Sequence, residues 1–255
     1  MRKVWSERVK HHIRPAYYAL FGRGLERFQC PICQYRGPFK DKRVSTRPDI
    51  IRKCSKCPSC GSTERHRMMH LVMKETFQAS DEACKALLHI APEHCLRKTL
   101  KECFSIYHTA DLMQPNVDFQ EDLQDLSFKD ASYDVVLISR VLNIPPKLNA
   151  CLHEIRRILK PGGMALIAET YTREQTLDFK PMKKGRSREI GVDFMKTLET
   201  VFDRVEFHTS DRFDPSFQLS NRMTFNGAPS DDYPPCVRIP GLGFNEIVAI
   251  CHRDA

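Results

Sequence analysis

The sequence contains no long hydrophobic run, no internal repeat and no low-complexity tract. A membrane-spanning helix needs about 20 consecutive apolar residues, so we do not expect an integral membrane protein. The first residues, MRKVWSERVKHHIR, are charged throughout and contain no apolar segment of the kind that directs secretion. Hydrophobic residues make up 41% of the chain and charged residues 28%, which is ordinary for a soluble globular protein. We therefore expect a cytoplasmic location.

Cysteine, in contrast, is abundant, with eleven residues in a chain of 255. Without an export signal, we expect these to be thiols or metal ligands and not disulfides. The net charge is +8, from 40 basic and 32 acidic residues, and the basic residues concentrate in the first 75 positions and around 180–188. Such charge is typical of a protein with a polyanionic partner such as nucleic acid, but a solvated basic surface explains it equally well.

Two cysteine pairs have the spacing of a metal site. The segments Cys30-Pro-Ile-Cys33 and Cys57-Pro-Ser-Cys60 each present two thiols from a tight turn. Two such pairs complete a tetrahedral zinc site, and four thiolates leave no open position for chemistry. We therefore predict structural Zn²⁺ on these four residues. Cys54 precedes Cys57 by three positions and could replace it in a different pairing.

Composition divides the chain into three parts. Residues 1–28 form a basic, aromatic arm, residues 29–66 the predicted zinc ribbon, and residues 67–255 the large domain. The aromatic residues of the arm could lie on a membrane surface, although Pro15 interrupts any long amphipathic helix; they are Trp5, Tyr17, Tyr18 and Phe21.

Short apolar runs alternate with helical patterns through the large domain, which is typical of an open α/β sheet. A helix should begin near Ser62 and join the two domains. Further helices are expected at 94–103, 147–159 and 192–201. Strands are expected at 87–91, 105–110, 116–119, 133–139, 164–169, 204–209 and 244–251, the last one antiparallel. The proline-containing stretch 211–243 has little periodicity and is predicted to be an irregular loop or lid on the substrate side.

Several segments together resemble one group of proteins. CPSCGSTERHR is followed about twenty residues later by LLHIAPEHCL, then by EDLQDLSFKDASYDVVLISRVL, LKPGG and REIGVDFMKTLE. The combination resembles class I S-adenosylmethionine-dependent methyltransferases, in the group with an N-terminal CPxCGSxERHR zinc segment and an HxAPE first loop. The resemblance implies a Rossmann-like, mostly parallel sheet with a small N-terminal zinc-ribbon domain. It also implies S-adenosylmethionine as cofactor.

Ligands of such sheets bind at the carboxyl ends of the strands. Glu93 falls in a first helical turn, where a carboxylate is favoured and could attract the amino group of the cofactor. Asp111, about twenty residues on, is placed to accept from the ribose hydroxyls. The resemblance assigns the adenine amino group to Asp122. The full predicted cofactor set is His89, Ala91, Pro92, Glu93, Asp111, Leu112, Asp122, Leu123, Ser139 and Arg140.

Each acid also has a purely structural interpretation. Glu93 could serve only the helix dipole, Asp111 could only cap its strand, and Asp122 could be an exposed loop charge. If the methyl acceptor is a hydroxyl, a general base is needed. Glu169, Tyr171 and Asp193 are the candidates for that role, and none is singled out by its neighbours in the sequence.

The resemblance implies a glycan or lipid-linked sugar as acceptor. Two alternatives remain open. The basic arm and ribbon could serve a nucleic-acid methyltransferase. The loop after the first strand lacks glycine, and RVLNIPP stands where the family usually has a block like HVLEH, so the chain could also be an inactive zinc-dependent adaptor.

Overall fold

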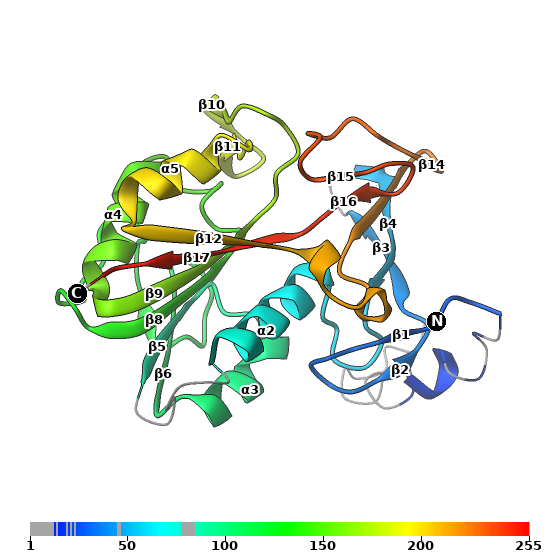
Figure 1. Cartoon of the computed structure of the whole chain (residues 1–255), viewed down its shortest axis with the longest axis horizontal. Coiled ribbons are helices and arrows are strands. Elements are labelled where there is room, and N and C mark those ends of the chain that lie inside the picture. Colours follow the sequence, from blue (N-terminus) through cyan, green and yellow to red (C-terminus); the bar gives the residue numbers. More distant parts are fainter. Residues whose placement is uncertain are drawn as a thin grey trace.

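The computed structural model describes residues 24–44, 47–77 and 85–254, together with several residues between 13 and 22. Trp5 and Phe21, named above for membrane contact, lie outside the described residues. Two β-sheets stand beside each other in the molecule (Figure 1). The larger one carries helices on both faces, and the smaller one lies on the side of the N-terminal segment.

The larger sheet has seven strands in the order β12-β17-β9-β8-β5-β6-β7. Its central part is parallel, while β17 runs antiparallel to both of its neighbours. This confirms the predicted sheet with a reversed last strand. The strands are β5 (Ala86–Ile90), β6 (Ile106–Asp111), β7 (Phe119–Gln120), β8 (Tyr133–Ser139), β9 (Leu159–Glu169), β12 (Arg204–Thr209) and β17 (Ile247–His252).

The two faces of this sheet are covered by different helices (Figure 1). Successive side chains of a strand point to opposite faces, and β8 follows this rule. Val136 and Ile138 join the hydrophobic cluster with α4 (Leu148–Ile158) and α5 (Phe194–Val201). Val135 and Leu137 join the cluster with α2 (Glu64–Phe77) and α3 (His94–Cys103). Burial on both faces explains why these strands read as continuous apolar runs.

The second sheet was not expected. It has the order β15-β16-β13-β4-β3, with β14 paired to β13. The strands are β3 (Lys40–Val44), β4 (Arg47–Lys56), β13 (Asn221–Phe225), β14 (Ala228–Pro229), β15 (Arg238–Ile239) and β16 (Gly243–Phe244). The prediction of an irregular stretch at 211–243 is therefore wrong, because its backbone groups pair with β4, which comes from the predicted zinc ribbon.

Two smaller pairs of strands complete the structure. The pair β1 (Phe28–Gln29) and β2 (Arg36–Gly37) flanks the first cysteine pair, and the hairpin β10 (Leu177–Lys183) and β11 (Arg186–Glu189) follows β9. Short 3-10 turns occupy Ser210–Arg212 (η2) and Pro215–Phe217 (η3). Among the described residues, no helix combines the length and the apolar character needed to span a bilayer. The boundary predicted at residue 66 stays a prediction; the β4–β13 pairing joins its two sides.

Candidate functional site

Four cysteine thiols gather beside β1 and β2. The Sγ atoms of Cys30, Cys33, Cys57 and Cys60 all lie within 4.8 Å of one another. Two pairs, Cys30–Cys60 and Cys33–Cys57, are 3.6 Å apart. Tetrahedral Zn²⁺ with bonds of about 2.3 Å places its sulfurs about 3.8 Å apart. The spacing therefore fits the ion.

The protonation of these thiols is interdependent. Hydrogen bonds with Cys30, then Cys57 and Cys60, hold the pKa of Cys33 well below its usual range. Hydrogen bonds with Cys30, Cys33 and Cys60 raise the pKa of Cys57. The Cys33 thiolate is thus stabilised by neighbours that include Cys57, which keeps its proton, whereas a bound dication would allow all four thiols to ionise. Cys54 is not part of the group, so the alternative pairing is not formed.

The carboxyl ends of the parallel strands bring several predicted cofactor residues to one edge. In the register, Ile90 of β5 pairs with Ala110 of β6 and with Ile138 of β8. The next residues, Ala91 and Arg140, both have positive φ, at 50° and 57°. Such backbone is uncommon for residues other than glycine and is often found at functional sites. Pro92 follows Ala91 at the same edge.

Glu93 lies at the N-terminal end of α3 and is largely buried. His89 Nε2 is 2.8 Å from its Oε2. Arg65 Nε and His66 Nε2 are each 3.6 Å from its Oε1, which has no hydrogen-bond partner in the described structure. Burial would raise the pKa of Glu93, but the hydrogen bond with His89 and the charges of His89, His66 and Arg65 outweigh it and hold the pKa at about 2. Glu93 is thus a carboxylate, with one oxygen available.

Asp111 ends β6 and is half-buried. Its Oδ1 accepts hydrogen bonds from the backbone amides of Met113 and Gln114, each at 2.7 Å. The carboxylate therefore caps the strand end, as one interpretation of the sequence expected. Its Oδ2 accepts no hydrogen bond from the described residues and is available to a sugar hydroxyl. Leu112, beside it, is exposed.

Asp122 lies in the segment after β7, and Leu123 beside it is buried. The Asp122 carboxylate accepts from the backbone amide of Gln124 at 2.9 Å and faces the Gln124 side-chain amide at 3.1 Å. Gln124 Oε1 in turn accepts from the backbone amide of Lys147 at 3.0 Å. Asp122 thus links the edge of the sheet to the start of α4.

Of the three candidates for a general base, Glu169 and Asp193 hold loops in place through hydrogen bonds. Glu169 Oε1 accepts from the backbone amide of Leu142 at 2.9 Å, and burial raises the pKa of Glu169 to about 7. Tyr171 is buried, and burial raises its pKa well above the usual range. Asp193 Oδ1 accepts from the amide and the hydroxyl of Thr176 at 2.8 and 2.7 Å. A base with a pKa near 7 suits proton abstraction, and Glu169 has such a pKa.

Charged residues of the second sheet lie near the carboxyl ends of the parallel strands. The sequence did not predict this contact between the two sheets. Arg52 Nη2 of β4 lies 2.6 Å from Glu64 Oε2 and 3.7 Å from Glu246 Oε1. Glu246 also pairs with Arg140, at the tip of β8. Burial lowers the pKa of Arg140 to about 10 even though Glu246 opposes the shift. We call Lys42, Arg52, Glu64, Arg65, Arg140 and Glu246 the inter-sheet cluster. Its one signal in the sequence is the charged ERHR segment that opens α2.

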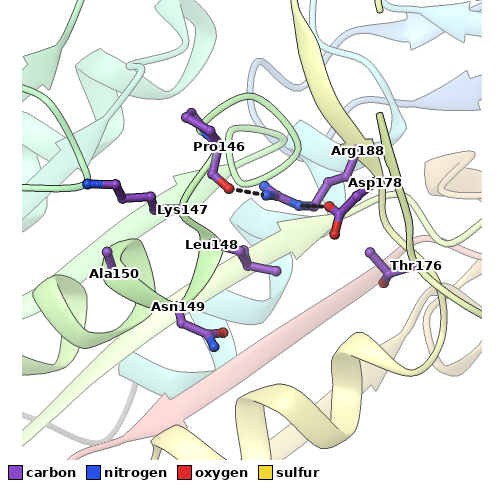
Figure 2. A pocket seen from close by; sticks show the side chains of 8 residues that line it. All are labelled: Pro146, Lys147, Leu148, Asn149, Ala150, Thr176, Asp178 and Arg188. Carbon is purple, nitrogen blue, oxygen red and sulfur yellow. Dashed lines mark hydrogen bonds and ion pairs between the residues drawn. The ribbon is translucent and has the colours of Figure 1, made fainter. Parts of the chain in front are cut away.

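A pocket of about 330 Å³ opens next to the start of α4 (Figure 2). Figure 2 shows Arg188 of β11 bound to Asp178 and to the carbonyl oxygen of Pro146, and these contacts attach the hairpin to the loop after β8. Thr176, held by Asp193, lines the same pocket. None of the predicted cofactor residues lines it. The pocket lies beside the carboxyl ends of the strands, which remain the candidate cofactor site.

Comparison with known proteins agrees with this architecture. Residues 83–167, about a third of the chain, match the model of a family described as methyltransferase domain. An arsenite methyltransferase of Aquipseudomonas alcaligenes is 34% identical over 76 residues, which cover 28% of this chain and 22% of that protein. A fatty-acid O-methyltransferase of Mycolicibacterium smegmatis is 30% identical over 93 residues, which cover 34% of each chain.

Among solved structures, the 1,6-didemethyltoxoflavin-N1-methyltransferase of Burkholderia thailandensis is similar over 75% of this chain and 79% of its own, with 15% identity and a TM-score of 0.45. The match covers 22% and 34% of the length of the arsenite and fatty-acid methyltransferases. Large polyketide synthase-nonribosomal peptide synthetases also match, and the match covers 1–3% of their length. The matched segment runs from before β5 into β9 and contains the strand tips described above. With the order of the sheet and its reversed strand, it shows that the chain has the Rossmann-like methyltransferase fold.

Proposed function

We propose that this protein is a cytoplasmic S-adenosylmethionine-dependent methyltransferase that carries a structural zinc ion. The observation that carries the proposal is the position of Asp111. It ends the second parallel strand of a sheet in methyltransferase order, next to the Ala91 turn, with one carboxylate oxygen unengaged by the described residues. An acid at this place is the usual partner of a ribose in nucleotide-binding α/β sheets.

The other contacts follow from the same placement. Asp111 would accept from the ribose hydroxyls, Asp122 from the adenine amino group, and the free Oε1 of Glu93 from the amino group of the methionine part. Ser139 and Arg140 would flank the reacting methyl. The cofactor supplies a methyl group on a positively charged sulfur, which leaves as a neutral thioether when an acceptor attacks. The protein chiefly has to align acceptor and methyl and exclude water.

The acceptor we propose is a glycan or a lipid-linked sugar. The support is the resemblance of the sequence from the CPSCGSTERHR segment through REIGVDFMKTLE. If a sugar hydroxyl is the nucleophile, it must lose a proton. Glu169, at the end of β9, is then the candidate base that we favour, because its pKa of about 7 suits proton abstraction.

The zinc ion would be held by Cys30, Cys33, Cys57 and Cys60. The thiols are too close together for all to ionise alone, and their spacing matches a tetrahedral ion. With four sulfur ligands the ion would have no open position, so it would stabilise the segment between β1 and α2 and take no part in methyl transfer.

Isothermal titration calorimetry of the full chain with S-adenosylmethionine and S-adenosylhomocysteine tests the proposal. We expect saturable binding of both at micromolar concentrations and about one zinc per chain by metal analysis. A zinc-loaded, folded protein that releases no heat at millimolar cofactor would contradict the enzymatic proposal. It would favour an adaptor that keeps the fold without the activity.

A further inference from the structure

Lys42 is a half-buried cation that has no partner among the described residues. It lies directly opposite Arg52 in the β3–β4 register, so the two side chains share one face of the second sheet. Among the described residues, it forms no hydrogen bond and no ion pair. Burial, followed by the charges of Arg52, Arg65 and Arg140, lowers the pKa of Lys42 to about 8. The carboxylate of Glu64 opposes this shift only in part. A lysine rarely lies near three arginines unless further negative charge joins them.

Two of these arginines have unused donors. The guanidinium of Arg65, at the start of α2, makes no hydrogen bond within the described part of the chain, and its one ionic neighbour is Glu93 at 3.6 Å. Arg140 pairs with Glu246 through one nitrogen, and its buried Nε has no hydrogen-bond partner among the residues that the structure describes. The buried hydroxyl of Ser139 beside it is also unpaired in the described structure. Buried polar groups normally find partners, so these atoms are available to a ligand.

The charges around this point do not balance. Arg52 pairs with Glu64, and Arg140 with Glu246. Glu93 has Arg65 as its nearest cation other than histidine, and Lys42 has no ion pair among the described residues. Glu169 also lies near Arg65 and Arg140, but burial raises its pKa to about 7, so it carries only part of a negative charge at neutral pH. S-adenosylmethionine would add a further net positive charge, because its sulfonium and ammonium groups outnumber its one carboxylate. An acceptor that brings negative charge would relieve this repulsion, whereas a neutral acceptor would not.

We propose that Lys42, Arg65 and Arg140 bind an anionic group, phosphate or carboxylate, of the methyl acceptor. The three side chains come from β3, from the start of α2 and from the tip of β8. The anion would therefore lie between the two sheets, next to the residue placed beside the reacting methyl. This inference rests on the proposed function and narrows the acceptor to a molecule with a phosphate or carboxylate near the methylated atom.

Inorganic pyrophosphate is the probe, titrated calorimetrically into the full chain alone, with S-adenosylhomocysteine and with S-adenosylmethionine. We expect millimolar or tighter binding that strengthens several-fold when the cationic S-adenosylmethionine is bound. Lys42→Met and Arg65→Met should each weaken pyrophosphate at least about tenfold, as expected for loss of a charge-assisted contact. Lys53→Met is the matched control. It follows Arg52 on β4, points to the opposite face and pairs with Asp41, so pyrophosphate affinity should not change.

The opposing results are distinct. If pyrophosphate competes with S-adenosylhomocysteine, and Lys42→Met weakens the cofactor instead, the cations serve the cofactor carboxylate and the inference is wrong. Equal weakening by Lys42→Met and Lys53→Met would indicate an adventitious ion only and would also overturn it. Failure of the proposed function is separate, because a chain that binds no cofactor can still be titrated with pyrophosphate.

Discussion

Replacing Arg67 with methionine should destabilise the protein strongly. This side chain on α2 is fully buried. It donates to the carbonyl oxygens of Ser55 and Ser62 at 3.0 Å, of Phe217 at 2.9 Å, and of Gln218. Arg67 therefore connects the residues before and after the second cysteine pair, Ser55 and Ser62, to η3. Methionine keeps most of the volume and removes every donor.

The expected loss of unfolding free energy follows from the four carbonyl groups that lose their donor. Each buried acceptor left without a partner costs about 1 kcal/mol or more, so the variant should lose about 4 kcal/mol of unfolding free energy. With a urea dependence of about 3 kcal/mol per molar, the midpoint should fall by roughly 1 M. Equilibrium unfolding in urea with zinc present, followed by circular dichroism, measures this shift.

The matched control is Arg212→Met. Arg212 forms an exposed ion pair with Glu75, also on α2, at 3.0 Å, so its loss should cost at most about 1 kcal/mol. A midpoint for Arg67→Met within about 0.3 M of the parent would show that the carbonyls find other partners, and the reasoning would fail.

Three further predictions concern zinc, pH and packing. Replacing Cys30 and Cys60 together with serine should remove zinc, whereas Cys54→Ser should retain about one equivalent; metal analysis of the purified variants decides this. Burial raises the pKa of Glu169 from 4.5 to about 7, so its protonated form stabilises the fold below about pH 4.5, and this stabilisation is lost as the pH rises through 7. Glu169→Gln should therefore gain about 3 kcal/mol over the parent at pH 8 and nothing near pH 4.5 in urea unfolding; a constant difference across this range would refute the assignment. Gly243→Ala should cost about 3 kcal/mol or more, because its Cβ would lie 1.9 Å from the carbonyl oxygen of Asn221; an unchanged thermal midpoint would contradict the observed β13–β16 pairing.

The larger sheet could be predicted because its strands are buried on both faces. The predicted bounds of β8, 133–139, are those observed, and so are those of α3, 94–103. Each of these elements can be predicted from its own residues, because they form a continuous apolar run or repeat with a helical period. The short edge strand β7 was placed at 116–119 and is found at Phe119–Gln120, because so few residues carry almost no pattern.

The second sheet could not be predicted in the same way. Strand β4 has the sequence RPDIIRKCSK, whose charged residues give no apolar alternation, and its partner β13 lies far along the chain. The predicted lid contains that partner. A sheet assembled from distant, polar strands is visible only once the chain has folded.

The candidate site was predictable in its positions but not in its contacts. Loop order alone brings Glu93 and Asp111 to one edge of the sheet. The hydrogen bond of Glu93 to His89 spans four residues, whereas the approach of Arg65 and the pairing of Arg140 with Glu246 depend on how the two sheets pack. Such contacts leave no periodic signal, so the charged ERHR segment at the start of α2 was the one indication of the inter-sheet cluster in the sequence.

The most direct test of the account is the affinity of Asp111→Asn for S-adenosylhomocysteine, measured by calorimetry beside the parent. Asparagine keeps an oxygen for the amides of Met113 and Gln114 but replaces the other acceptor with a donor. We expect binding to weaken at least about tenfold, while Asp118→Asn, which changes an acid bonded to Thr109, leaves it within about twofold. Equal affinity of Asp111→Asn and the parent would contradict the claim that this carboxylate binds the ribose.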